Sequence, residues 1–177
     1  MSRLVLAHTG ELDEAELAAA RALMVLAFDD FAEEDWEHAL GGMHALVVDE
    51  AGERVLAHAS LVMRRLLYAG RALRTGYVEA VATHPEHRRR GHASTVMAAL
   101  EGLASAYDLL ALGATDEAVP FYDGRGWQRW RGRSGVLAPD GLRATPDDDG
   151  AIYVLSGASD LDLDAPLTCD WRPGDVW

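Results

Sequence analysis

A basic segment at residues 88–93 offers the clearest chemistry in this sequence. It has the spacing Arg88-x-x-Gly91-x-Ala93, with two further arginines inside it. Consecutive main-chain amides at the start of a helix, beside a glycine that permits close approach, form a site for anions. Arginine side chains add charge-assisted hydrogen bonds to phosphate. The segment therefore predicts a site for the phosphates of a cofactor; the alternative is a solvated basic loop that caps a helix.

A strand must lead into this segment and a helix must follow it. Residues 71–83 predict the strand, in which Glu79 is the one charged residue near the end. The apolar side chains that follow recur at i, i+3, i+4 and i+7, which predicts an amphipathic helix over residues 92–107. A strand, helix, strand unit is typical of parallel pairing through a right-handed crossover.

The remaining pattern alternates strands and helices around that unit. Expected strands and helices are 3–8 (strand), 11–28 (helix, capped by Thr9 or Gly10), 33–40 (helix), 43–48 and 55–68 (strands), 109–114 (strand), 116–125 (helix), and 127–131 with 151–155 (final strand pair). The strands at 43–48, 55–68 and 71–83 are expected to form an antiparallel meander. The long excursion that contains PDGLRATPDDDG predicts turns, and the tail shows no periodicity. The order predicts one α+β domain over residues 1–177, with a mixed, mostly antiparallel sheet flanked by helices.

Composition narrows the class of ligand. The chain has 177 residues and a net charge of −13, from 29 acids and 16 basic residues, all of them arginine. The absence of lysine excludes Schiff-base chemistry on lysine, and the acidic balance argues against nucleic acid as a partner. Arginines gather between Arg64 and Arg90, and acids dominate from Asp140 onward. This distribution predicts one anionic and one cationic ligand; the alternative is that the charge only keeps the protein in solution.

Other features favour a cytoplasmic protein. The sequence has no apolar run long enough to span a membrane and no signal-peptide pattern at its start. Its single cysteine, Cys169, cannot form an internal disulfide. The seven histidines lack ligand spacing, and the DDDG run lacks the alternation of an EF-hand, so we expect no metal site.

The element order, together with Arg-x-x-Gly-x-Ala at a strand-to-helix junction, resembles the GNAT superfamily of acyl-CoA N-acyltransferases. The strings DWEHALGGMHALV, GYVEAVA, GRGW, SGVLAP, TPDDDG and CDWRPGDVW are similar to the aminoglycoside 2'-N-acetyltransferases. That similarity runs from the first strand to the last residue. It implies the GNAT fold, acetyl-CoA as co-substrate, and acetyl transfer to the 2'-amine of an aminoglycoside by direct attack in a ternary complex.

The resemblance assigns the cofactor site to the end of the fourth strand and the loop after it. A splay beside that strand would let the pantetheine arm bind to its backbone, and an amide near Val81 would polarise the thioester carbonyl. The residues implied for acetyl-CoA binding are Val81, Ala82, Thr83, Arg88, Arg89, Arg90, Gly91, His92 and Ala93.

Two side chains are implied as catalytic. Glu79 would accept a proton from the reacting amine, directly or through water, because an ammonium cannot attack a thioester. Tyr122 would give a proton or a hydrogen bond to the leaving thiolate. The structural alternatives are an exposed strand glutamate and a buried aromatic residue.

Acidic loops carry the substrate hypothesis, because an aminoglycoside bears several ammonium groups. The substrate-binding residues implied are Asp30, Glu79, the Ala80 carbonyl, Gly113, Asp147, Asp148, Asp175 and the Trp177 carboxylate. Two positions depart from the family expectation: Gly113 stands where a serine is expected, and Ala80 stands where a glycine is expected. These departures affect the range of substrates more than the reaction.

Other functions and an oligomeric state also follow from the sequence. A second enzymatic hypothesis is a GNAT that acetylates another polyamine or an amino sugar of the cell envelope. A third is a module that binds acyl-CoA or cationic drugs without turnover. The aromatic region around Trp127 and Trp130 suggests a homodimer surface.

Overall fold

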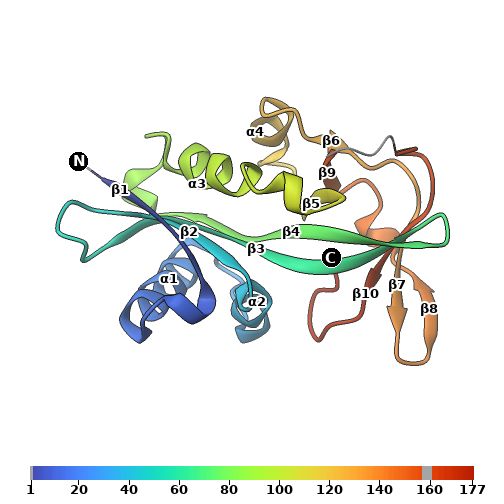
Figure 1. Ribbon diagram of the computed structural model, residues 1–177, viewed down its shortest axis with the longest axis horizontal. Coiled ribbons are helices and arrows are strands. Elements are labelled where there is room, and N and C mark those ends of the chain that lie inside the picture. Colours follow the sequence, from blue (N-terminus) through green and yellow to red (C-terminus); the bar gives the residue numbers. More distant parts are fainter. Residues whose placement is uncertain (1, 157–160) are drawn as a thin grey trace. The chain divides into compact units, whose positions relative to one another are not determined.

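A computed structural model describes residues 2–156 and 161–177. The chain divides into two compact units, which we describe separately: unit 1 is Met1–Val62 with Val78–Leu103, and unit 2 is Met63–Tyr77 with Ala104–Trp177. The two longest strands, β3 (Val55–Tyr68) and β4 (Arg71–Thr83), each belong partly to both units (Figure 1).

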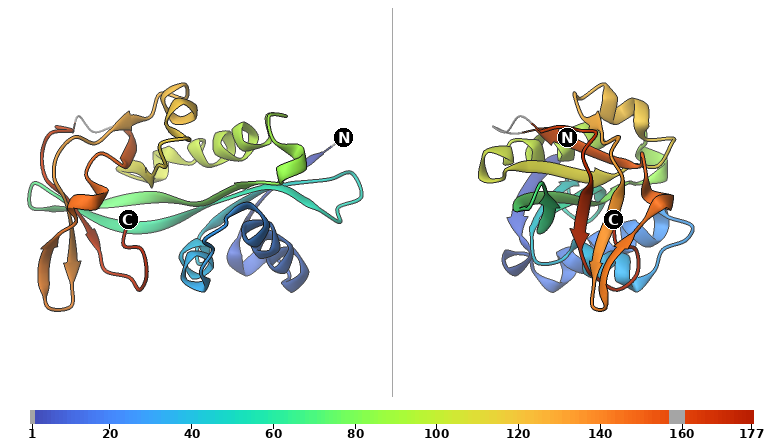
Figure 2. Two further views of the ribbon diagram at one scale, coloured as in Figure 1. Left: turned by 180° about the vertical axis from the view of Figure 1, so that it is seen from behind. Right: turned by 90° about the vertical axis from the view of Figure 1, so that its right-hand side faces the viewer.

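Unit 1 places helices on both faces of a small sheet. Strand β1 (Arg3–His8) pairs antiparallel with β2 (Met43–Val48), which pairs antiparallel with β3. Helices α1 (Glu14–Ala27) and α2 (Glu33–Ala39) cover one face, and α3 (His92–Glu101) covers the other (Figures 1 and 2). The core of the unit is buried apolar side chains, among them Leu23, Met24, Leu46, Val96, Met97 and Leu100.

The first helix starts later than the sequence predicted. Residues Thr9–Glu11 form a separate 3-10 turn, and Asp13 caps α1 by accepting a hydrogen bond from the Glu16 amide. Thr9 does not cap the helix because its hydroxyl instead contacts His44 and accepts from the Gly41 amide. The predicted cap was therefore wrong, although the helix itself is confirmed.

Helix α3 is shorter than predicted. Its predicted apolar face is confirmed at Val96, Met97 and Leu100, but the helix ends at Glu101, with Gly102 as its C-cap. Residues Ala104–Ala106 form a separate 3-10 turn. Glycine is a poor helix former, which accounts for the early end.

Unit 2 holds most of the sheet. The strand order is β6-β9-β5-β4-β3-β10-β7-β8. Pairing is parallel for β4 with β5 and for β10 with β7, and antiparallel for β5 with β9, β6 with β9, β7 with β8 and β10 with β3. The strands not yet defined are β5 (Leu109–Gly113), β6 (Gln128–Arg129), β7 (Ser134–Ala138), β8 (Gly141–Ala144), β9 (Ile152–Ser156) and β10 (Leu167–Asp170).

The predicted crossover and final strand pair are confirmed, but three strands were missed. Strand β5 follows α3 in the chain and lies parallel to β4, and β6 pairs with β9. The stretch interpreted as turns contains the hairpin β7–β8, whose turn is formed by Pro139 and Asp140. The tail interpreted as irregular contains β10, whose partners β3 and β7 are distant in sequence.

The short helix of unit 2 is also narrower than predicted. Helix α4 spans Val119–Asp123, and Pro120 lies in its first turn, where proline is favoured. Its Tyr122 ring packs edge-on against Trp127, with ring centroids 6.0 Å apart. Of the neighbouring residues Phe121 and Tyr122, Tyr122 is buried and Phe121 is half-buried. The Arg125 guanidinium lies over the Phe121 ring.

The tryptophans suggested for a dimer surface are buried inside the chain. Trp127 is 3% exposed and Trp130 is 0% exposed. The Trp130 indole donates to the Ala165 carbonyl at 2.8 Å and packs edge-on against Tyr68. These residues therefore give no surface for a second copy.

The predicted α+β class with a mixed, mostly antiparallel sheet is confirmed. Among the described residues, none of the helices combines the length and the apolar character that crossing a membrane requires.

Candidate active site

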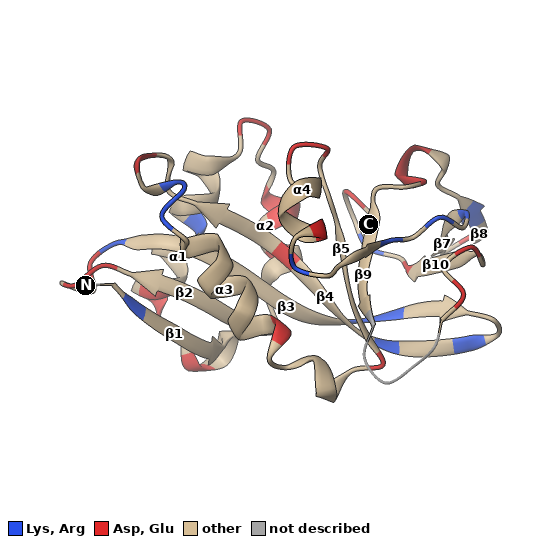
Figure 3. Cartoon of the chain, turned by 90° about the horizontal axis from the view of Figure 1, so that it is seen from above, with Lys and Arg blue, Asp and Glu red and all other residues tan. Residues whose placement is uncertain are grey.

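The basic segment, residues 88–93, lies in unit 1 and leads from the loop after β4 into the first turn of α3. His84, directly after β4, caps the 3-10 turn Pro85–His87. The three arginines that follow are exposed, and Figure 3 marks the positions of arginines along the chain in blue. Gly91 has φ +84°, in the left-handed region that favours glycine, and is the N-cap of α3. The predicted strand, loop and helix arrangement is thus confirmed.

The start of α3 fits an anionic group. No side chain caps this helix end. The first amides of a helix have no partner within the helix, and they carry the positive end of its dipole. Thr95 donates its hydroxyl to the Gly91 carbonyl at 3.1 Å, so that hydroxyl is turned back into the helix. The amides at the helix start, beside three exposed arginines, match the donor set that a pyrophosphate requires.

The end of β4 carries Glu79 on an irregular backbone. Glu79 is half-buried. The next residue, Ala80, has φ +54°, a conformation uncommon for residues other than glycine. Glycine adopts such a conformation without steric strain, which explains why a glycine is expected at this position. The Ala80 carbonyl accepts a hydrogen bond from His58 Nδ1 at 2.9 Å. The parallel pairing of β4 with β5 covers Thr75 to Tyr77, before β4 reaches Glu79.

Three side chains before the arginines also gather, which the spacing of the histidines did not predict. Ligand atoms of His84, Glu86 and His87 lie within 4.8 Å of one another. The pKa of His87 is lowered by partial burial and by the charge of Arg90. The cationic neighbours therefore oppose, rather than favour, a metal ion at this cluster.

In unit 2, the three consecutive aspartates of the TPDDDG segment have different surroundings. Asp149 accepts hydrogen bonds from the Ser134 amide and hydroxyl and pairs with Arg133, which together lower its pKa. Asp147 is exposed. Asp148 is half-buried, and its pKa is raised by burial and by the Asp175 carboxylate. Asp149 thus anchors the loop, while Asp148 and Asp175 form a like-charged pair.

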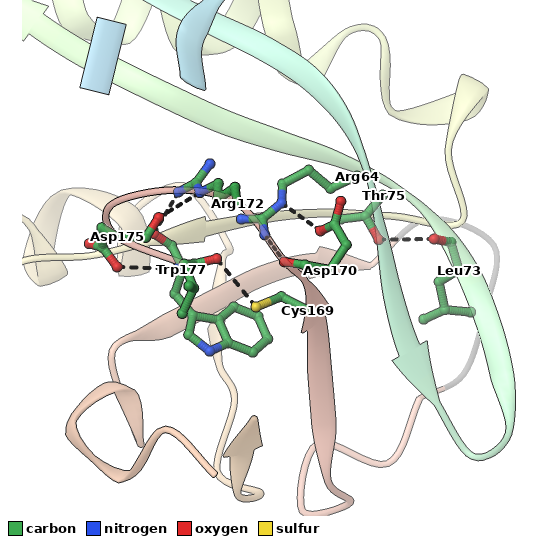
Figure 4. A network of polar contacts seen from close by, with 9 residues as sticks. Arg64, Leu73, Thr75, Cys169, Asp170, Arg172, Asp175 and Trp177 are labelled. Carbon is green, nitrogen blue, oxygen red and sulfur yellow. Dashed lines mark hydrogen bonds and ion pairs between the residues drawn. The ribbon is translucent and has the colours of Figure 1, made fainter. Parts of the chain in front are cut away.

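The chain end packs against this loop through Trp177, which is 5% exposed (Figure 4). Its indole Nε1 donates to Thr145 Oγ1 at 2.9 Å, and its amide donates to Asp175 Oδ1 at 3.2 Å. Arg172 donates to main-chain oxygens of Asp175 and Trp177, at 2.6 and 2.8 Å. The position of the Trp177 main-chain oxygen is therefore fixed by hydrogen bonds.

Gly113, at the end of β5, lies next to Trp177. A Cβ atom added at Gly113 would be 3.7 Å from the Tyr77 hydroxyl and 3.9 Å from the carbonyl carbon of Trp177. Both are ordinary contact distances, so a serine would fit here. Unit 2 therefore brings Gly113 and Trp177 together, and the Trp177 amide bonds to Asp175, which is paired with Asp148.

Tyr122 is buried at 5% exposure. Burial raises the pKa of its hydroxyl to about 12, although Arg125 acts in the opposite direction. The hydroxyl is therefore protonated at neutral pH and can donate a hydrogen bond.

Comparison with known proteins identifies the family. Residues 9–130 match the family model described as "Acetyltransferase (GNAT) domain". The chain is 48% identical to the "Aminoglycoside 2'-N-acetyltransferase" of Mycolicibacterium fortuitum, over 97% of this chain and 90% of that protein.

The chain belongs to the GNAT acetyltransferase family.

Solved GNAT structures share the fold of this acetyltransferase. A GNAT family N-acetyltransferase from Escherichia coli in complex with CoA has a TM-score of 0.65 and 14% identity, over 97% of this chain and 91% of that one. A GNAT family acetyltransferase from Brucella melitensis in complex with acetyl-CoA has a TM-score of 0.59 and 13% identity, over 93% and 94%. The predicted GNAT fold is confirmed.

The predicted site residues of this acetyltransferase fall into two sets. Unit 1 holds Asp30, Glu79, Ala80 and the whole cofactor segment, whereas unit 2 holds Gly113, Tyr122, Asp147, Asp148, Asp175 and Trp177. Asp30 lies in the exposed turn after α1. A cavity of about 420 Å³ between β1, α1 and β2 contains none of the predicted site residues.

Several residues that organise the two sets were not predicted. In unit 2, Arg64 donates to Asp170 at 2.8 Å, and both Arg64 and Arg172 lie over the Tyr77 ring. Ser134 and Thr145 hold the acidic loop. Of these residues, only Arg64 lies outside the strings that carry the family resemblance: Tyr77 lies in GYVEAVA, Ser134 in SGVLAP, Thr145 in TPDDDG, and Asp170 and Arg172 in CDWRPGDVW. Buried polar contacts give no periodic pattern, so the strings indicated a family but not these structural roles.

Proposed function

We propose that this acetyltransferase transfers the acetyl group of acetyl-CoA to the 2'-amino group of aminoglycosides by direct attack in a ternary complex. The similarity to the Mycolicibacterium fortuitum protein, which extends over nearly the whole of both chains, carries this proposal. The pairing of half-buried Asp148 with exposed Asp175 supports a cationic substrate, since a cation would relieve the repulsion between the two carboxylates.

The residues of the cofactor segment have separate roles in this proposal. The amides from Gly91 to Ala93 bind the pyrophosphate of acetyl-CoA, and the exposed arginines at 88–90 add charge, including to the ribose phosphate. The main chain of Val81, Ala82 and Thr83 binds the pantetheine arm, and the Val81 amide polarises the thioester carbonyl.

Glu79 acts as the general base. At neutral pH the substrate amine is an ammonium, whose nitrogen has no lone pair for attack. A carboxylate within reach removes the proton, through a bridging water in the arrangement we favour.

Tyr122 assists the departure of the CoA thiolate. Its pKa of about 12 keeps the hydroxyl protonated, so it stabilises the thiolate by donating a hydrogen bond and can pass on the proton.

Substrate recognition rests on carboxylates and main-chain oxygens. Asp148, Asp175 and the Trp177 carboxylate bind ammonium groups, and Asp30 and Asp147 provide further carboxylates for the substrate. Glu79 and the Ala80 carbonyl contact the reacting amine. Gly113 leaves space where a serine would add one hydrogen bond.

Matched antibiotics test the reaction. With acetyl-CoA as donor, an aminoglycoside with a 2'-amino group is expected to release free CoA with at least about 10³-fold higher kcat/KM than its 2'-hydroxy counterpart, because the hydroxyl is a far weaker nucleophile and presents no charge. Thiol release gives the rate, and NMR of the product gives the acetylated position. Equal turnover of the two drugs would refute the regiochemistry, and turnover of neither would refute the substrate class.

Replacing Asp148 tests the acidic site. Asp148→Asn is expected to raise the KM for the aminoglycoside about tenfold or more, because it removes a charge-assisted hydrogen bond, and to leave the KM for acetyl-CoA unchanged. Asp140→Asn, at the exposed β7–β8 turn, is the matched control for lost charge. An equal rise in the KM for the drug in both variants would mean that net charge alone attracts the substrate.

The alternative substrate class is another polyamine or an amino sugar of the cell envelope, and the same acidic pair favours it. Comparison of kcat/KM for the two classes separates them.

We also propose that residues 1–177 form one GNAT domain of a cytoplasmic protein. A homodimer stays a prediction, now without the tryptophan surface that suggested it.

A further inference from the structure

A chain of hydrogen bonds through two buried histidines ends at the residue after Glu79. His44 on β2 and His58 on β3 are both 0% exposed. Thr9 Oγ1 lies 2.8 Å from His44 Nε2, His44 Nδ1 lies 2.9 Å from His58 Nε2, and His58 Nδ1 lies 2.9 Å from the Ala80 oxygen. All four residues belong to unit 1. The Trp36 ring lies 6.2 Å from each imidazole and helps to shield the pair.

The direction of every hydrogen bond in this chain is determined. A carbonyl oxygen can only accept, so His58 carries its proton on Nδ1. Burial lowers the pKa of His58 to about 3 and that of His44 to about 4, so both rings are neutral at pH 7. The bare Nε2 of His58 therefore accepts from His44 Nδ1, and the bare Nε2 of His44 accepts from the Thr9 hydroxyl.

The far end of the chain is held by the backbone. Thr9 Oγ1 accepts from the Gly41 amide at 2.9 Å and also lies 3.2 Å from the Gly42 oxygen. We call this hydrogen-bonded series of Thr9, His44, His58 and Ala80 the relay. It connects the turn before β2 to the irregular end of β4. Burying two imidazoles without hydrogen-bond partners would cost free energy. Here each of the four ring nitrogens has a partner.

The receiving carbonyl belongs to a residue in a strained conformation. Ala80 has φ +54°, in the left-handed region that a residue with a Cβ atom seldom adopts. A strained conformation persists only where its surroundings hold it. The carbonyl has two lone pairs, so the bond from His58 leaves one for a substrate amine.

We propose that His58, supported by His44 and Thr9, is a positioning residue for acetyl transfer: it fixes the Ala80 peptide and thereby the direction in which Glu79 and the Val81 amide leave β4. This inference rests on the proposed function, because it assumes that Glu79 is the base. A displacement of about 1 Å at a reacting group can lower a rate about 10²-fold.

The test compares two replacements of His58. Asparagine places its Nδ2 donor close to the position of Nδ1, whereas leucine fills the site without a donor. His58→Leu is expected to lower kcat with a 2'-amino aminoglycoside at least about tenfold, with little change in the KM for acetyl-CoA, and His58→Asn is expected to recover most of the rate. Thr9→Val, which removes only the distant hydroxyl, should lower kcat less. His38→Asn on α2 is the control histidine.

A spectroscopic measurement on the wild-type protein tests the relay without a variant protein and without an activity assay. Two-bond proton–nitrogen NMR correlations at pH 7 should show both rings as the neutral Nδ1–H tautomer, whereas free neutral histidine favours Nε2–H. An Nε2–H or charged His58 would overturn the relay. Equal activity of His58→Leu and wild type, or equal loss in the leucine and asparagine variants, would overturn the positioning role. Wild-type protein that acetylates no aminoglycoside would instead overturn the proposed function, and the NMR result would still decide the relay.

Discussion

Replacing Glu79 by glutamine is expected to lower kcat about 10²- to 10³-fold at pH 7, which is within the usual contribution of a general base. Glutamine keeps the size and hydrogen-bonding reach of the side chain but cannot take up a proton. The loss should shrink as the pH rises, because more of the substrate amine is then neutral without help. A pH–rate profile with saturating acetyl-CoA measures both effects.

The same variant should bind acetyl-CoA as the wild type does, because it leaves unchanged both the main chain of Val81–Thr83 and the basic segment at 88–93. Isothermal titration with acetyl-CoA checks this directly. Glu14→Gln, an exposed change in the first turn of α1, controls for the loss of one negative charge. An unchanged kcat in the Glu79 variant would show that another group or solvent accepts the proton.

Acidification between pH 7.5 and 5 is expected to lower the free energy of unfolding by about 2 kcal/mol for each of His44 and His58. Both folded-state pKa values, about 4 and about 3, lie below the usual 6.5. The unfolded chain therefore binds protons first as the pH falls. The stabilisation from these residues is complete above pH 6.5 and is lost progressively below it. Urea denaturation at several pH values measures the slope.

The double variant His44→Asn, His58→Asn should show a much flatter dependence over the same range, whatever its absolute stability. His8, whose charge acts on His44, stays in place in both proteins. The lower limit of pH 5 avoids most carboxyl titration. Asp148, whose raised pKa acts in the opposite direction, is likewise present in both proteins. Parallel slopes in the two proteins would assign the acid sensitivity to other groups.

The sequence predicted those parts of the fold in which a pattern repeats locally. Apolar segments bounded by turn residues located β1 to β5, and the apolar face of α3 was predicted correctly at Val96, Met97 and Leu100. It missed the local hairpin β7–β8, because the turn residues of PDGLRATPDDDG were interpreted as turns throughout. It missed β10, because β10 pairs with β3 and β7 across about a hundred and about thirty residues of sequence. Pairing at that separation depends on the rest of the sheet and leaves no local periodicity.

Site residues on one continuous segment could be predicted, whereas those that meet through tertiary structure could not. The segment from Arg88 to Ala93 is contiguous, so its spacing indicated its chemistry. His44 and His58 are fourteen residues apart and meet because β2 and β3 pair in a register that places them on one face. The different surroundings of Asp147, Asp148 and Asp149 depend on Ser134 and Arg133, which no spacing rule connects to them.

The pairing of Asp148 with Asp175 makes proton binding and ligand binding competitive. A raised pKa means that, as the pH falls, Asp148 takes up a proton more readily than an isolated carboxyl does, because the proton relieves the repulsion from Asp175. An ammonium group of the substrate that binds at the two carboxylates neutralises them in place of that proton and displaces it. The heat measured on mixing drug and enzyme near the pKa of Asp148 would then include the ionisation heat of the buffer, so titrations in buffers of different ionisation enthalpy would count the protons released.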